Sequence, residues 1–148
     1  MGGMVDKEKL NAGFAAFRKA ARAELGGKVY TRQGYLCCGG CASSALYGEC
    51  MAAHAKRPDS IAGTVYYTLQ DKGGMAKGYA LYLNYGAFAP EDGSIGEDER
   101  AKKTHAIGTT LTRCLREAGL EVEWDGDIRT RIKVEPEARV VYRPVDYR

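Results

Sequence analysis

The stretch that decides the fold is TVYYTLQDKGGMAKGYALYLNYG, which runs from Thr64 to Gly86. Apolar and polar residues alternate at both of its ends, over 64–71 and again over 79–86. A period of two is typical of β-strands. The glycine-rich link 72–78 is short enough to join the two strands as a hairpin. The sequence therefore predicts an antiparallel pair of strands in this part of the chain.

Three helices are predicted by apolar residues that recur with helical spacing. The first begins after a cap at Asp6 and ends at the Gly-Gly pair 26–27. The second begins in a cysteine-rich stretch and ends before Pro58. The third follows a capping-box pattern at 94–97, has an acidic first turn, and ends at Gly119.

Short alternating runs close the chain. They are LEVEW at 120–124, RIKV at 131–134 and RVVYR at 139–143. The Asp-Gly pair at 125–126 is a common turn between two such runs, so a second hairpin is predicted here.

The order of these elements predicts an α+β fold. We expect one domain over residues 1–148, with flexible ends at 1–5 and 144–148. An antiparallel or mixed sheet of about five strands would carry three helices gathered on one face.

The segments YLCCGGC, YYTLQD, LYLNYG and AGLEVEWDGDIRTRIKV together resemble a small bacterial domain family with no assigned activity. In that family a Cys-Cys-x-x-Cys element precedes strands of this type, and a Gly-Leu-x-Val-x-Trp-Asp-Gly-Asp hairpin closes the chain. The likeness spans 35–134 in patches. Its most specific pieces are Cys37, Cys38 and Cys41 at that spacing and the Trp-Asp-Gly-Asp at 124–127. The resemblance implies a fold and a cysteine element, but no reaction. After Cys41 this chain departs from the pattern, with Ala-Ser-Ser and a longer helical segment.

Composition excludes several classes of protein. Hydrophobic residues make up 45% and charged residues 28% of the chain, which is ordinary for a globular domain. No apolar run approaches the roughly 20 residues that cross a bilayer, so no membrane partner is expected. The 22 basic and 19 acidic residues are mixed along the chain, which makes a nucleic-acid partner improbable. Because the start lacks the pattern of a secretory signal, we expect a cytoplasmic protein.

A zinc site is one interpretation of the cysteine-rich stretch. Cys38, Cys41, Cys50 and His54 supply four soft ligands, in the spacing C-x-x-C and C-x-x-x-H. An unbroken helix would place Cys50 about 13 Å beyond Cys41, whereas sulfurs on one zinc lie within about 4 Å of each other. A four-ligand site therefore requires a break near Gly48.

A reactive thiol is a second interpretation. Cys41 would lie at the start of the second helix, where unpaired backbone N–H groups favour the thiolate. This makes Cys41 a weak catalytic candidate, for which His105 is the imaginable base, although the helical spacing turns His105 toward solvent. A redox pair of Cys38 and Cys41 is the other form of this interpretation. No convergent set of catalytic residues is visible, so an enzyme is not the favoured expectation.

Packed thiols are the simplest interpretation. Ala42, Leu46 and Cys50 share one narrow face of the predicted helix, and Cys114 lies in the apolar stripe of the third helix. On this interpretation no cofactor is expected. Zinc is the cofactor expected if the metal-site interpretation holds instead.

Two tyrosines indicate a contact function. Tyr66 and Tyr82 would lie on the sheet face opposite the apolar residues, and exposed tyrosines are typical of protein-binding surfaces. The alternative is that helices cover both faces of the hairpin. We expect a small protein-binding module of the inhibitor or adaptor type, whose partner is another protein. The alternative function is zinc binding or thiol chemistry at the Cys37-Cys38-Gly-Gly-Cys41 element.

Overall fold

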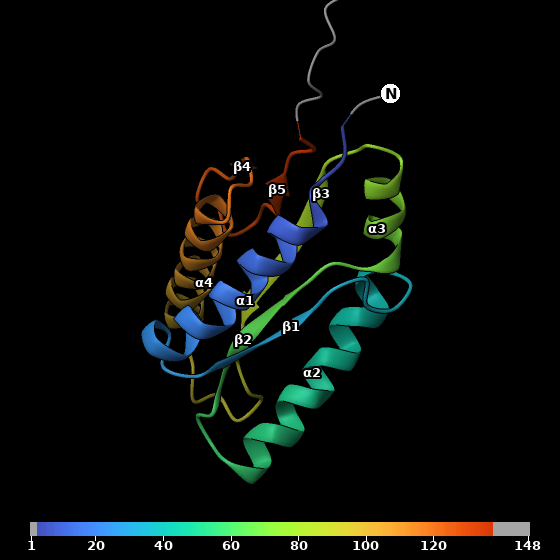
Figure 1. Cartoon of the computed structure of the whole chain (residues 1–148). Helices are drawn as coiled ribbons and strands as arrows, with labels where there is room; N and C mark the ends of the chain where they lie inside the picture. The colour runs from blue at the N-terminus through green and yellow to red at the C-terminus, as the bar shows by residue number, and fades with distance from the viewer. Residues whose placement is uncertain (1–2, 138–148) are drawn as a thin grey trace, which may run out of the picture.

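The structure, a computed structural model, describes residues 3–137 (Figure 1). The predicted strand at 139–143 and the predicted flexible end at 144–148 lie outside these residues. In chain order the elements are α1 (Lys7–Glu24), β1 (Lys28–Arg32), α2 (Gly39–Lys56), β2 (Ile61–Tyr66), α3 (Leu69–Ala76), β3 (Leu81–Ala87), α4 (Glu97–Glu117), β4 (Val122–Glu123) and β5 (Ile132–Val134). Within residues 3–137 the α+β class and the mixed sheet of five strands are confirmed, while the helices number four instead of three.

The sheet has the strand order β1-β2-β3-β5-β4. β1 and β2 are parallel, whereas β2 with β3, β3 with β5, and β5 with β4 are antiparallel. A parallel pair needs a crossover connection, because its second strand must start at the same end as the first. α2 is that crossover.

Helices cover both faces of the sheet, so the expectation of helices on one face is wrong. α1 and α4 pack side by side over one face, and α2 runs along the other (Figure 1). Consecutive side chains of β2 point to opposite faces of the sheet: Val65 faces α1 and α4, while Tyr66 faces α2. The largest fully buried side chains of the α1 and α4 side are Leu10, Phe14, Phe17, Val65, Leu81, Leu83, Ile107, Leu111, Leu115, Ile132 and Val134.

The predicted strand 64–71 is too long at its C-terminal end. β2 ends at Tyr66, and the glycine-rich link forms α3, the helix that the sequence analysis missed. The Thr68 hydroxyl accepts a hydrogen bond from the Asp71 N–H (3.3 Å), and the Asp71 carboxylate accepts one from the Thr68 N–H (3.0 Å). This capping box satisfies N–H groups at the start of α3 and stabilises a helix that contains two glycines. β2 and β3 still pair antiparallel, as predicted.

Side-chain caps were predicted at the starts of two helices, and one of them is confirmed. The Asp6 carboxylate caps α1 by accepting a hydrogen bond from the Lys9 N–H at 3.0 Å. The capping box at 94–97 is wrong, because α4 is capped by Gly96, which has no side chain to accept a bond. The Ser94 N–H instead donates to the Asp92 carboxylate in a turn before the helix.

The two C-terminal runs pair, but their strands are shorter than predicted and residues 124–131 separate them, so they are not joined by the predicted two-residue turn at 125–126. β4 and β5 pair antiparallel, and Trp124 joins this hairpin to the rest of the fold. The Trp124 indole donates to the Tyr85 hydroxyl at 2.8 Å, and its ring lies against Gly108 of α4.

Two further observations concern the N-terminal segment and the character of the helices. Val5, near the N-terminal end of the described residues, is buried in the core. No helix within residues 3–137 combines the length and the apolar character needed to span a bilayer.

Candidate thiol centre

The loop between β1 and α2 carries the cysteine element and is tied to the segment after β2. The Tyr35 N–H donates to the Tyr67 carbonyl, and the Leu69 N–H donates to the Leu36 carbonyl, both at 2.9 Å. These bonds place the start of α2 beside the start of α3 (Figure 1). Leu36 itself has a φ of 57°, a left-handed conformation that is unfavourable for a leucine. The loop therefore holds a strained residue directly before the cysteines.

Cys38 is the N-cap of α2. Its backbone is extended (φ −154°, ψ 171°), and its carbonyl accepts the first helical hydrogen bond from the Ala42 N–H at 3.0 Å. Gly39 and Gly40 form the beginning of the helix, and a Cβ added to either would meet no atom within 4 Å. The first turn of the helix is therefore open to solvent.

Three sulfur atoms meet at this helix start. We use the name thiol cluster for Cys37, Cys38 and Cys41, whose Sγ atoms all lie within 4.8 Å of one another. The Sγ of Cys37 lies 3.8 Å from that of Cys38 and 3.4 Å from that of Cys41. Cys37 and Cys41 are exposed and Cys38 is half-buried, so the cluster is accessible from solvent.

Cys38 and Cys41 differ in acidity. The backbone N–H of Cys41, followed by the thiols of Cys37 and Cys41, lowers the pKa of Cys38, although the Cys38 sulfur accepts no cap hydrogen bond of ordinary geometry. The neighbouring sulfurs of Cys37 and then Cys38 raise the pKa of Cys41 to about 11. Of these two thiols, Cys38 is therefore the one that favours the thiolate, at the N-terminus of the helix, where the dipole stabilises a negative charge. The sequence predicted the thiolate at Cys41 instead.

Cys50 and His54 lie away from the thiol cluster, so the structure does not bring together the predicted four ligands. α2 continues without a break through Gly48. Cys50 is 1% exposed on the inner face of the helix, and burial raises its pKa to about 11. His54, in the last turn, has its Nε2 3.4 Å from the Asp92 carboxylate. Cys50 is thus a packed thiol, as is the buried Cys114.

His105 is separated from Cys41 by the sheet. His105 belongs to α4, and its ring packs on Trp124 with 5.5 Å between the ring centroids. Cys41 belongs to α2, on the other face of the sheet. A Cys–His catalytic pair of these two residues is therefore absent from the described part of the chain.

Tyr66 and Tyr82 have different environments. Tyr66 is 8% exposed because α2 covers it with Ala42 and Leu46, so the expectation that it is a surface residue is not met. Tyr82 is 38% exposed, and the Arg131 guanidinium lies 5.0 Å from the centre of its ring. Helices on both faces, the alternative considered above, explain the burial of Tyr66.

Sequence reasoning placed two of the three clustered cysteines among the metal ligands and left Cys37 out. Cys37 and Cys38 are adjacent, and adjacent side chains in an extended segment point in opposite directions. In the structure the two sulfurs nevertheless lie 3.8 Å apart. The three-residue spacing of Cys38 and Cys41 was the detectable signal, because it matches one turn of a helix.

The fold and the site define a class: an α+β domain with helices on both faces of a mixed sheet and an exposed thiol cluster at the start of the crossover helix. The chain belongs to the family described as a domain of unknown function, DUF6891, which it matches over residues 3–139. No curated protein and no solved structure matches the chain. The family membership assigns no activity, so function must be argued from the site.

Proposed function

We propose that this protein binds a thiophilic metal ion through the thiolates of Cys37, Cys38 and Cys41, and that this ion is zinc. The observation that carries the proposal is the mutual approach of the three sulfurs. Thiolates bound to zinc at about 2.3 Å in tetrahedral geometry lie about 3.8 Å from each other. The Sγ distances of 3.8 and 3.4 Å from Cys37 lie close to this value.

Three thiolates leave one position of a tetrahedral ion open. Within residues 3–137, no histidine or carboxylate joins the thiol cluster. Structural zinc sites are closed by four protein ligands, whereas sites with three protein ligands bind water or another molecule at the fourth position. The open fourth position and the exposure of the thiol cluster to solvent suit a site that takes up and releases its metal ion, or that presents the ion to a ligand.

The raised pKa of Cys41 predicts how this binding depends on pH. Metal ions bind the thiolate, so binding releases the protons that the free thiols carry. The Cys41 thiol, with a pKa of about 11, is protonated at neutral pH and must lose its proton to the solvent on binding. The affinity for zinc should therefore rise with pH, by about tenfold per unit for each proton released.

The test is a zinc titration of the reduced protein against a chromophoric chelator, together with the thiolate-to-metal absorption of the cobalt-substituted protein. We expect one ion per chain and strong sulfur-to-cobalt absorption. Cys37→Ser, Cys38→Ser and Cys41→Ser should each weaken binding by at least tenfold, because each removes one of three ligands.

Cys50→Ala is the matched control on the same helix. It should leave the number of bound ions and the affinity unchanged, although it lowers the melting temperature because Cys50 is buried. Absence of zinc and cobalt binding, or equal loss in Cys50→Ala and Cys38→Ser, would contradict the proposal.

A contact function remains a prediction, supported at Tyr82 alone. Exposed tyrosine and arginine side chains such as Tyr82 and Arg131 are enriched in protein interfaces. If a protein partner uses this surface, cross-linking of the complex should decrease in Tyr82→Ala and stay unchanged in Tyr47→Ala, which removes another half-exposed tyrosine. A cytoplasmic location also stays a prediction.

A further inference from the structure

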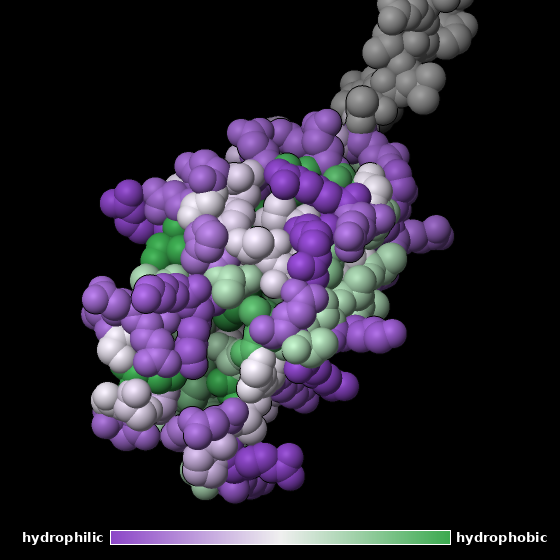
Figure 2. Space-filling view, turned by 90° about the vertical axis from the view of Figure 1, so that its left-hand side faces the viewer, coloured by the Kyte–Doolittle hydropathy of each residue, from purple (hydrophilic) through white to green (hydrophobic). Residues whose placement is uncertain are grey.

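A second site lies at the other end of α2, in a hollow of about 400 Å³. Its walls come from the C-terminal end of α1, the last turn of α2, the start of β2, the loop after β3 and the first half of α4. Figure 2 shows an apolar hollow ringed by hydrophilic side chains on this face. α2 is about 27 Å long at 1.5 Å per residue, so the hollow is separate from the thiol cluster at its N-terminus.

The floor of the hollow is apolar. Leu25, Ile61, Phe88, Ile95 and Ile107 contribute to it from different elements. The Phe88 ring packs against the His54 ring, which also lines the hollow, at 5.8 Å between ring centroids. A concave surface of this size with a few polar groups at its rim is typical of small-molecule sites.

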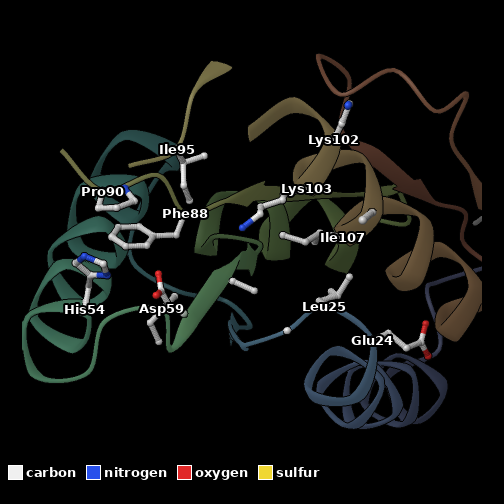
Figure 3. Close-up of a pocket in the computed structure, with 14 residues that line it drawn as sticks. Glu24, Leu25, His54, Asp59, Phe88, Pro90, Ile95, Lys102, Lys103 and Ile107 are labelled. Atoms are coloured by element: carbon white, nitrogen blue, oxygen red, sulfur yellow. The ribbon is translucent and has the colours of Figure 1, made fainter. Parts of the chain in front are cut away.

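Two opposite charges extend into the hollow. The Lys103 ammonium reaches in from α4, and the Asp59 carboxylate from the loop after α2, whereas Lys102 points away (Figure 3). Lys103 has a single partner, Glu99, at 3.4 Å, and both side chains are about half exposed, so this pair is weak. Asp59 forms no ion pair with any residue in 3–137.

Of the other charged residues around the hollow, Lys102 points away and the rest have partners. Glu24 binds Arg113 at 2.7 Å, and His54 faces Asp92. Lys103 and Asp59 are therefore the two groups left to bind a ligand, one of each sign above one apolar floor.

We propose that this hollow binds a small zwitterion with an apolar side chain, that is, an apolar α-amino acid. Lys103 binds the carboxylate of the ligand and Asp59 binds its ammonium group, while the side chain lies on the floor beside Phe88. A volume of about 400 Å³ accommodates an aromatic amino acid. The proposal does not depend on metal binding at the thiol cluster.

The test is a titration of ¹⁵N-labelled protein with L-phenylalanine, followed by the amide chemical shifts. We expect shifts centred on Ala62, Phe88 and Ala106, all of which line the hollow. Phenethylamine lacks the carboxylate and 3-phenylpropionate lacks the ammonium group. Each should bind about tenfold more weakly, because each leaves one charged partner unused.

Two variants assign the charges. Lys103→Gln should remove the preference for L-phenylalanine over phenethylamine, and Asp59→Asn should remove the preference over 3-phenylpropionate. Asparagine tolerates the φ of 64° at position 59, so this variant keeps the backbone. Lys102→Gln is the matched control, which removes a neighbouring lysine that points away and should keep both preferences.

Three results would overturn the proposal. The first is the absence of shifts around the hollow, and the second is equal affinity of all three compounds. The third is a Lys102→Gln variant that behaves like Lys103→Gln, because the effect would then be one of general charge.

Discussion

Leu36 adopts a left-handed conformation (φ 57°) directly before the thiol cluster. Two hydrogen bonds anchor this part of the loop, one from the Tyr35 N–H to the Tyr67 carbonyl and one from the Leu69 N–H to the Leu36 carbonyl. Leucine pays about 1–2 kcal/mol for such a conformation. No sequence pattern indicates it, since glycine or asparagine is the usual residue at a positive φ.

The strain at Leu36 can be measured with a pair of variants. Leu36→Gly should be more stable than Leu36→Ala by about 1 kcal/mol, because glycine adopts a positive φ without steric cost. At an ordinary exposed position the order is the reverse. Chemical denaturation of both variants checks this, and an alanine variant as stable as the glycine variant would show that residue 36 is unstrained.

The acidities of the cysteines predict an order of alkylation in the reduced, metal-free protein. Because its pKa is lowered, Cys38 forms the thiolate at lower pH than an ordinary cysteine and should react first with iodoacetamide near neutral pH. Cys41, with a pKa of about 11, should react more slowly and accelerate only in alkaline solution. Peptide mapping against time and pH gives the order, and faster reaction at Cys41 would reverse our assignment.

At the scale of elements, the sequence was most informative where one period extended over several turns. α1 and α4 were predicted with nearly correct ends because their apolar stripes are long. α3 was not predicted, because Thr68 and Asp71 of its capping box lie inside the alternating run 64–71, which was assigned to a strand. In addition, glycines rarely occur inside a helix. The covering of Tyr66 by α2 depends on tertiary packing, which the local pattern does not contain.

The continuity of α2 gives a prediction for Gly48. This glycine is exposed in mid-helix, and a Cβ added there would meet nothing within 4 Å. Gly48→Ala should therefore stabilise the protein by about 1 kcal/mol. Thermal unfolding and zinc titration of the variant test both points, because a break at Gly48 that brought Cys50 to the metal would make the substitution harmful to both.

At the scale of the whole molecule, close approaches at glycines join elements that are distant in the chain. Gly13 of α1 lies against Leu115 of α4, and Gly108 of α4 lies against the Trp124 ring, which a Cβ would approach to 2.5 Å. These contacts involve residues far apart in the chain. The sequence therefore predicted the presence of the hairpin around Trp124 but not its packing on α4.

Gly108→Ala tests this packing. The added methyl group would collide with a ring that is held by a hydrogen bond to Tyr85, so we expect a loss of about 1–3 kcal/mol of stability. The fluorescence of Trp124, the single tryptophan, should also change. Gly48→Ala is the control for a glycine-to-alanine change without collision, and unaltered stability of Gly108→Ala would show that the hairpin packs differently.

The anchoring of the cysteine loop to Tyr67 and Leu69 has a consequence during protein synthesis. A nascent chain exposes Cys37, Cys38 and Cys41 outside the ribosome before the anchoring segment has emerged. Until that segment emerges, the loop before α2 lacks its hydrogen bonds to Tyr67 and Leu69. Anchoring of the loop is thus delayed by about 30 residues of translation, which takes about 2–6 seconds at ordinary rates of elongation.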